Sequence, residues 1–272
     1  MTTTAPARSN IAKAVSDGRI VMWRNLKRIP RIPELAVFAI IQSIVFVLLF
    51  AFVFGGAIPL PGGGSYREFL MPGIFAQTIA FASATTAIGL TDDIGKGIID
   101  RFRSLPMARS AVIFGRVGAD IFYNAGILVV LMLAGLAVGW RVHNGVGPFL
   151  AGVGLLLAFA IGMSLLGVWM GILVPTVEVA NQVAFTVLFP ITFLSNVFVP
   201  PQTLPGFLRP IAEWNPVSVL TAGIRDLWGN PNPFVGNGFS ARNPVLMSLA
   251  WTVVFIVVFG RIAVRKYRRL NR

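Results

Sequence analysis

The chain has 272 residues, of which 56% are hydrophobic and only 12% are charged. A soluble domain carries about 25% charged residues, so much of this chain's surface is expected to face lipid. The sequence has no cysteine, which excludes a disulfide framework and a cysteine-based metal site, and its single histidine argues against a histidine-centred active site. We therefore expect no catalytic residues and no metal site in this chain.

The first 34 residues carry charges throughout and show no apolar core ahead of a small-residue cleavage site, so no cleavable signal is predicted. Within them, residues 16–31 read SDGRIVMWRNLKRIPR. Ile20, Trp23 and Leu26 recur at roughly helical spacing, with Arg and Lys residues between them. This pattern is typical of an amphipathic helix that lies on anionic lipid. The alternative is a basic flank that only sets the orientation of the first span.

Six stretches are long and apolar enough to cross about 30 Å of hydrocarbon. They lie at 35–54, 69–90, 117–139, 149–173, 182–199 and 244–263. Seven Lys and Arg residues precede the first stretch, five lie in 92–116 and six lie from residue 261 onward, against five on the opposite side. Because basic residues concentrate on the cytoplasmic side, both termini are predicted to be cytoplasmic. The net charge of +13 is explained by basic residues that flank the spans on the cytoplasmic side. We therefore expect no nucleic-acid partner.

The cytoplasmic segment 95–116 reads GKGIIDRFRSLPMARSAVIFGR and stands out among the apolar stretches by its five basic residues. Ile98, Phe102 and Leu105 form one apolar stripe of a short helix that is predicted to end near Pro106. Such a stripe lies on the bilayer surface or docks into a groove of a cytoplasmic partner. The residues alone favour neither alternative.

The segment 200–243 is predicted to lie on the outer side of the membrane. Five prolines between 200 and 216 interrupt it, and each proline breaks a continuous helix. The stretches PGFLRPIAEW and LTAGIRDLWGNP are too short to span, but their aromatic and charged residues suit a helical hairpin that dips into the outer interface. The alternative is an ordinary outer loop with an aromatic belt.

Two of the six stretches, 69–90 and 182–199, are unusually rich in Gln, Asn, Ser and Thr. Because hydrocarbon offers no hydrogen bonds, such side chains prefer contact with protein or with a cavity. They serve either as contacts between helices or as the lining of a substrate path. The candidates for the second role are Gln77, Phe81, Phe185, Phe189, Phe193 and Asn196.

Three further patterns concern packing. Gly135–Gly139 and Gly167–Gly171 are pairs of small residues that allow two helices to approach closely. Arg116 and Asp120 are four residues apart, a spacing that allows them to pair on a helix where it enters the membrane. This pairing would give Asp120 a structural role; a role in gating is the alternative.

The pattern GIIDRFRSLPMARSAVIFGR after the second stretch resembles the first cytoplasmic loop of ABC-2 type transporter permeases, and in particular the daunorubicin-resistance (DrrB-like) branch of bacterial exporters. A second match, LFPITFLSNVFVPPQTLPGFLRPIAEWNPVSVLTAGIRDLW at 188–228, resembles the fifth span and the outer segment of the same family. The resemblance covers residues 20 to 270 in span number and loop lengths.

The resemblance implies an all-α integral membrane fold with six transmembrane helices, an N-terminal amphipathic helix, a cytoplasmic coupling helix and outer re-entrant helices. It also implies that the permease works as a dimer, with a second identical or paralogous copy, on a separate ATPase subunit. The coupling helix would contact that ATPase through Ile98, Asp100, Arg101, Phe102, Arg103 and Leu105. The two polar stretches would flank the substrate pathway of the dimer.

The sequence contains no G-x-x-x-x-G-K-[ST] motif, so the chain is not expected to bind ATP or Mg²⁺ in a phosphate-binding loop; both would bind to the partner ATPase. The resemblance implies ATP-driven export of amphipathic drugs or lipid-like molecules across a bacterial plasma membrane. The close alternative is an ABC-2 permease for a polysaccharide or a lipid-linked glycan, which should show more acidic and aromatic platforms. A proton- or sodium-coupled transporter would need an intramembrane ionisable residue, for which Asp120 is the only candidate. A membrane-embedded enzyme would need clustered catalytic groups.

Overall fold

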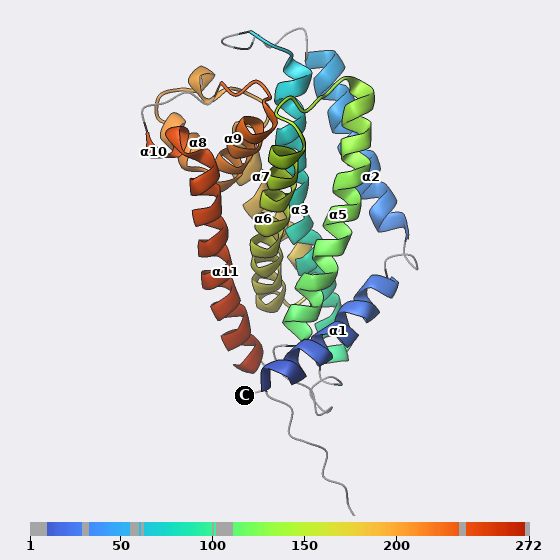
Figure 1. The fold of residues 1–272 in the computed structure, drawn as a ribbon. Helices are drawn as coiled ribbons and strands as arrows, with labels where there is room; N and C mark the ends of the chain where they lie inside the picture. The colour runs from blue at the N-terminus through green and yellow to red at the C-terminus, as the bar shows by residue number, and fades with distance from the viewer. Residues whose placement is uncertain are drawn as a thin grey trace, which may run out of the picture.

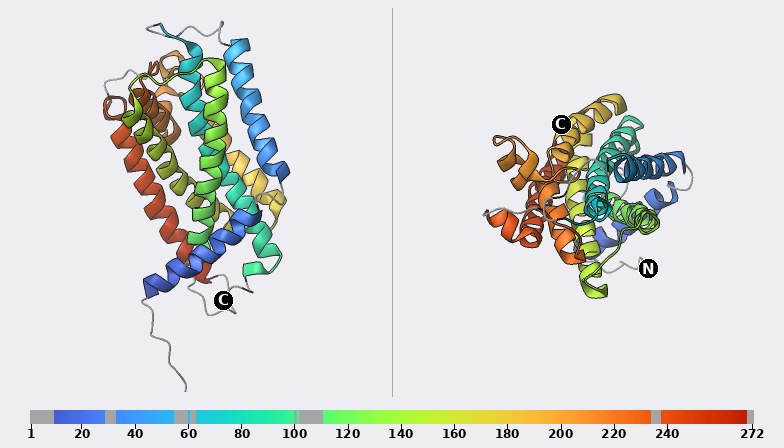
Figure 2. Two further views of the ribbon diagram at one scale, coloured as in Figure 1. Left: turned by 45° about the vertical axis from the view of Figure 1, so that its right-hand side comes forward. Right: turned by 90° about the horizontal axis from the view of Figure 1, so that it is seen from above.

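A computed structural model describes residues 10–28, 33–54, 60, 63–99, 101, 111–233 and 238–269 of the chain. Within these residues the secondary structure is helical and contains no strand. Long helices run side by side, α1 lies across one end of the bundle, and α8, α9 and α10 gather at the other end (Figures 1 and 2). The predicted all-α membrane class is confirmed at this level.

The elements follow one another in chain order as α1 (Asn10–Arg28), α2 (Pro33–Leu48) with a π-helical continuation η2 (Leu49–Phe54), α3 (Tyr66–Gly95), α5 (Ala111–Val138), α6 (Val146–Leu173), α7 (Val177–Phe193), the 3₁₀ turn η3 (Pro201–Thr203), α8 (Arg209–Trp214), α9 (Pro216–Trp228), α10 (Phe239–Arg242) and α11 (Pro244–Arg269).

Four helices of the described part are long and apolar enough to cross a membrane: α3, α5, α6 and the Pro244–Lys266 part of α11. Two shorter apolar helical stretches are also present. Ile40–Val53 lies inside the first predicted span, and Val177–Phe193 overlaps the fifth, 182–199, but begins five residues before it. A multi-pass membrane protein follows from the four long helices, and the complete six-span layout stays a prediction.

The helix α7 ends at Phe193, six residues before the predicted limit of 199. The chain turns at Leu194, whose N–H donates to the carbonyl oxygen of Pro190, and residues 195–198 are buried. Pro200 and Pro201 follow directly, and proline cannot continue the hydrogen-bond ladder of a helix. The apolar composition of 194–199 is therefore explained by burial against protein, outside a continuous spanning helix.

The helix α9 is delimited by two strong local signals. Asn215 caps its start, because the Asn215 side-chain oxygen accepts a hydrogen bond from the N–H of Val217 at 2.8 Å, and Pro216 occupies the first helical position, where its missing N–H costs nothing. Gly229 ends the helix in the left-handed region at φ +71°. The Asn-Pro pair of the outer segment thus starts the helix α9.

The core is centred on α3, which packs against α6, α7 and α9. The closest approach joins α3 to α6: a methyl group placed on Gly167 would lie 2.3 Å from the carbonyl oxygen of Ser83, and one on Gly171 would lie 2.6 Å from that of Ala87. The predicted close approach at Gly167–Gly171 is therefore present. The prediction for Gly135–Gly139 is wrong, because Gly139 lies in the turn after α5 with φ +104°.

The helix α1 packs across α5 through glycine. A methyl group on Gly115 would lie 2.6 Å from the carbonyl oxygen of Gly18, so the two backbones are nearly in contact. Val21 is buried in this contact, whereas Ile20 and Trp23 are 65% and 60% exposed. Two of the three residues that motivated the amphipathic prediction thus face away from the bundle, Leu26 is only partly exposed, and the contact of this helix with lipid stays a prediction.

Candidate functional site

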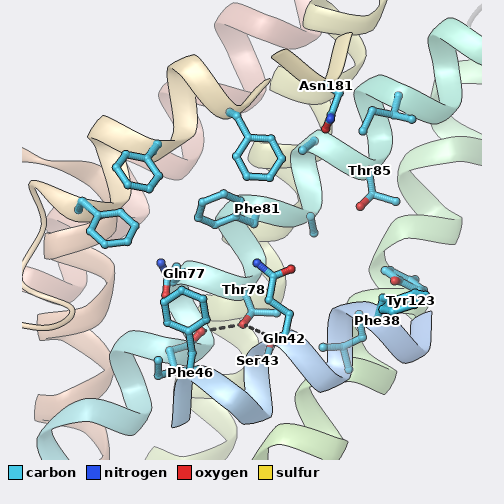
Figure 3. A pocket seen from close by; sticks show the side chains of 18 residues that line it. Phe38, Gln42, Ser43, Phe46, Gln77, Thr78, Phe81, Thr85, Tyr123 and Asn181 are labelled. Atoms are coloured by element: carbon cyan, nitrogen blue, oxygen red, sulfur yellow. Dashed lines mark hydrogen bonds between the residues drawn. The ribbon is translucent and has the colours of Figure 1, made fainter. Parts of the chain in front are cut away.

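Side chains of the described helices line a cavity of about 320 Å³ that is open to the outside. Its walls come from α2, α3, α5 and α7, with α3 contributing the largest share of the side chains (Figure 3). A volume of this size is at the lower end of the range for pockets that hold drug-sized ligands. The cavity therefore has the dimensions of a small-molecule site.

Phenylalanine rings dominate the apolar part of the wall. Phe185, Phe189 and Phe193 lie four residues apart, so they project from one face of α7 into the cavity. The rings of Phe189 and Phe193 stack with centroids 4.1 Å apart, and Phe81 of α3 approaches Phe185 with centroids 5.8 Å apart. Phe38 and Phe46 of α2 complete this apolar wall.

Amide and hydroxyl groups make up the polar part of the wall. The hydroxyl of Thr78 donates to the carbonyl oxygen of Ile74 at 2.8 Å and lies 3.4 Å from the hydroxyl of Ser43. Gln42, Gln77 and Asn181 bring carboxamides from α2, α3 and α7 respectively. Every lining residue is uncharged at neutral pH, since the only ionisable group in the wall is the phenol of Tyr123.

Five of the six residues predicted for a substrate path, Gln77, Phe81, Phe185, Phe189 and Phe193, line this cavity. Their role in transport stays a prediction. The sixth, Asn196, does not line it. Asn196 is fully buried at the turn after α7, where its N–H donates to the hydroxyl of Ser218 at 3.0 Å in α9.

Sequence reasoning missed Gln42, Ser43 and Tyr123 as lining residues. A signal for the first two was available, because Gln42 and Ser43 are the only polar residues in the stretch 35–54. Tyr123 carried no such signal, since a tyrosine in an apolar helix serves equally well at a membrane interface.

A charged cluster ties α1, α3 and α5 together at the end of the bundle where α1 lies. The carboxylate of Asp93, which is almost fully buried, contacts the guanidinium groups of Arg116 at 3.1 Å and Arg24 at 3.4 Å. The short ion pair of Arg116 is therefore made with Asp93 and not with Asp120, to which Arg116 remains only an electrostatic neighbour. Gly89 explains the difference: it has no side chain, and a methyl group there would lie 2.2 Å from Nη2 of Arg116, so the guanidinium crosses to α3 over this glycine.

Asp120 forms a hydrogen bond to a hydroxyl group, whereas Asp93 forms ion pairs with arginines. Its carboxylate accepts a hydrogen bond from the hydroxyl of Thr86 at 2.8 Å. Asp120 does not line the cavity. These contacts support the structural role that was expected for this carboxylate.

The predicted coupling helix lies mostly outside the described residues. Asp100, Phe102, Arg103 and Leu105 cannot be placed in the part of the chain that the structure describes. Ile98 is half-buried, Arg101 is exposed, and the N–H of Arg101 donates to the carbonyl oxygen of Gly97 at 3.2 Å, which gives a helical turn. The neighbour Ile99, which was not singled out, is buried in an apolar cluster with residues of α5 and α6.

Comparison with known proteins gives a consistent result. Residues 18–227 match the family model described as ABC-2 type transporter. The chain is 28% identical to the daunorubicin resistance ABC transporter permease protein DrrB1 of Streptomyces coeruleorubidus, over 98% of this chain and 90% of that protein. It is 26% identical to the inner membrane transport permease YadH of Escherichia coli, over 81% and 82% of the two chains.

A further relative is the probable doxorubicin resistance ABC transporter permease protein DrrC of Mycobacterium tuberculosis, which is 24% identical over 86% of this chain and 81% of that protein. The matched region includes α3, α7 and the cavity between them.

Proposed function

The chain belongs to the ABC-2 type transporter family, and from this membership we propose that it is the permease subunit of an ATP-driven exporter that moves amphipathic drugs or lipid-like molecules out of the cytoplasm or the inner leaflet. Two of its relatives carry names of drug-resistance permeases. The observation that carries the proposal is the uncharged, phenylalanine-rich cavity between α2, α3, α5 and α7, because apolar walls with a few polar groups suit an amphipathic ligand.

Export of a polysaccharide or a lipid-linked glycan receives less support. A site for a long hydroxylated chain would be expected to show carboxylates beside its aromatic platforms. The cavity has six phenylalanines and no carboxylate in its wall. We therefore keep the amphipathic cargo as the proposal.

We further propose that α2 and α7 complete six membrane crossings, with both termini in the cytoplasm of a bacterium. The helix α2 and its continuation η2 run over Pro33–Phe54 with few interruptions of their apolar character. An even number of crossings agrees with the ribbon, in which α1 and the C-terminal end of α11 lie at the same end of the bundle (Figure 1). The excess of basic residues at this end supports a cytoplasmic location.

A separate ATPase subunit and a second permease copy are part of the proposal. The segment from Ile98 onward would seat on the ATPase, which would bind ATP and Mg²⁺. Two contacts support transmission from this segment to the spans: Ile99 packs into the core beside α5 and α6, and the carboxylate of Asp93, shortly before it, joins α3 to α1 and α5.

The test is the ATPase activity of the complete complex in nanodiscs, with the ATPase subunit that copurifies with this chain. The double variant Arg101→Glu/Phe102→Ala is expected to lose the partner or its substrate-stimulated ATPase activity. The matched control is Phe207→Ala/Arg209→Glu, which makes the same two chemical changes in the outer segment, where Phe207 is 76% exposed. Equal activity of the two double variants, or the absence of any copurifying ATPase, would contradict the proposal.

A further inference from the structure

The helix α9 buries a full positive charge that has no carboxylate in contact with it. Arg225 is 0% exposed, and none of the ion pairs between described residues includes it. The neighbouring Asp226 is exposed, and its carboxylate accepts a hydrogen bond from Asn232 at 2.7 Å. Burial lowers the pKa of Arg225, so its surroundings disfavour the charge, yet an arginine side chain stays protonated in proteins.

The groups that contact this guanidinium are all neutral. Nε donates to the carbonyl oxygen of Phe69 at 2.9 Å, and Nη2 donates to those of Asn196 and Val197 at 3.1 and 3.4 Å. The ring of Phe69 lies over the guanidinium, with its centre 3.6 Å from Cζ. Nη1 is buried and has no hydrogen-bond partner in the described part of the chain. Part of the guanidinium is therefore removed from water without replacement, which costs free energy.

A second buried polar group without a partner belongs to the residue that Arg225 contacts. Asn196 is 0% exposed, its carbonyl oxygen accepts from Nη2 of Arg225, and its N–H donates to the hydroxyl of Ser218 at 3.0 Å. Neither Nδ2 nor Oδ1 of its carboxamide has a hydrogen-bond partner among the described residues. Nη1 and Nδ2 carry two N–H groups each, so the two contacting residues offer several donors to a further group.

The donors and the charge together favour a small anion. An anion accepts N–H donors and balances a buried cation, whereas a water molecule would balance no charge. Neither side chain reaches the surface, and the turn that ends α7 is closely packed: a methyl group on Gly73 would lie 2.9 Å from the carbonyl oxygen of Val197. These conditions suit a monatomic halide better than a carboxylate or a phosphate.

From these observations we propose that a chloride ion binds to Nη1 of Arg225 and Nδ2 of Asn196 and neutralises the charge buried between α9 and the turn that ends α7. The site lies apart from the cavity, whose wall includes neither residue. The inference is independent of the transported molecule. The ion would strengthen the contact of α9 with α3 and α7, since Arg225 bonds to both.

The test measures thermal unfolding of the purified chain in an uncharged detergent while potassium gluconate is replaced by potassium chloride. The ionic strength stays constant, so general screening does not change. Chloride at about 30 times its dissociation constant is expected to raise the unfolding midpoint by about 4 °C. Bromide should have the same effect and sulfate should not. Line broadening of the ³⁵Cl resonance by the folded chain measures binding directly.

The decisive variant supplies the negative charge from the protein. Asn196→Asp replaces the carboxamide by a carboxylate of almost the same shape, so chloride should no longer raise its unfolding midpoint or broaden its ³⁵Cl resonance. The matched control is Asn243→Asp, the same change at an exposed position, which should keep the full chloride effect. If Asn196→Asp does not fold, Asn196→Leu removes the Nδ2 donor and should raise the half-maximal chloride concentration by about tenfold.

An unfolding midpoint that does not depend on chloride would refute the site and leave a water molecule as the partner of Nη1. An equal effect of sulfate and chloride would also refute it, because it would indicate a general salt effect. The same holds if Asn196→Asp, or Asn196→Leu in its place, responds to chloride like Asn243→Asp. None of these results bears on the export function, which the ATPase measurement tests separately.

Discussion

The contact between α3 and α6 leaves no room for a single methyl group at Gly167, and the variant Gly167→Ala tests this directly. The added carbon would lie 2.3 Å from the carbonyl oxygen of Ser83 and 2.8 Å from Cβ of Thr86. Ordinary contacts begin near 3.4 Å, so the two helices would have to separate by about 1 Å. The carbonyl oxygen belongs to the backbone and cannot rotate away, in contrast to the end of a flexible side chain.

The expected cost follows from two opposing effects. Overpacking a well-packed core costs about 1–3 kcal/mol, whereas replacing glycine by alanine inside a helix gains up to about 1 kcal/mol. Because the clash is with a backbone atom, the upper part of the overpacking range, about 2–3 kcal/mol, applies. The net loss in the free energy of unfolding is therefore expected to be about 1–2 kcal/mol. The measurement is reversible unfolding of the purified chain in mixed micelles of mild detergent and dodecyl sulfate, followed by circular dichroism.

The control lies on the same helix. Gly154→Ala places a methyl group where nothing lies within 4 Å, so it keeps the helix-propensity gain and adds no clash. It is expected to unfold at the same or a higher fraction of dodecyl sulfate than the unaltered chain. If Gly167→Ala is no less stable than Gly154→Ala, the packing argument for this contact is refuted.

Two further predictions use the same unfolding measurement. Asp93→Asn removes the buried charge that Arg24 and Arg116 contact. It is expected to cost about 2 kcal/mol, because the partly buried guanidinium of Arg116 loses its counter-ion. Asp92→Asn removes a partly exposed charge that pairs with the exposed Lys96 and should cost less than about 1 kcal/mol; equal losses would contradict this. Arg225 is buried in α9 and donates to the carbonyl oxygens of Phe69, Asn196 and Val197. Arg225→Lys keeps the charge but cannot reproduce the planar array of donors, so it should cost about 1–3 kcal/mol and lower the folded fraction in size-exclusion chromatography. A fully stable variant would contradict a structural role for these hydrogen bonds.

The sequence was sufficient for features that repeat or that act locally. Phe185, Phe189 and Phe193 recur every four residues, so a helix places them on one face wherever it packs. Asn215 and Pro216 act on the helix that they start, which makes the beginning of α9 readable from neighbours in the chain. The family followed from motifs of the same local kind.

The sequence could not predict which residue on another helix a given side chain contacts. Arg116 is equally well spaced for Asp120, but it contacts Asp93 because Gly89 opens a path across α3. Asn196 carries the same polar signal as Gln77, yet α7 ends before it and leaves it under α9 and away from the cavity. In both cases the contact partner depends on how two helices approach each other, and the composition of a single helix does not reveal that approach.

Arg225 of α9 joins three parts of the fold: α9 itself, α3 and the turn that ends α7. Its guanidinium is fully buried, lies 3.6 Å from the centre of the Phe69 ring, and donates to the carbonyl oxygens of Phe69, Asn196 and Val197. The last two belong to the turn that ends α7, so their carbonyl groups have no helical partner and would be buried unsatisfied without this cation. The carbonyl groups at the early end of α7 are therefore satisfied by Nη2 of Arg225, while its Nη1 has no hydrogen-bond partner among the described residues. These hydrogen bonds hold α9 to α7 and α3, so α9 cannot move away from either helix unless they break. The same α7 carries three of the phenylalanines of the cavity, so the position of α9 is linked to the cavity wall.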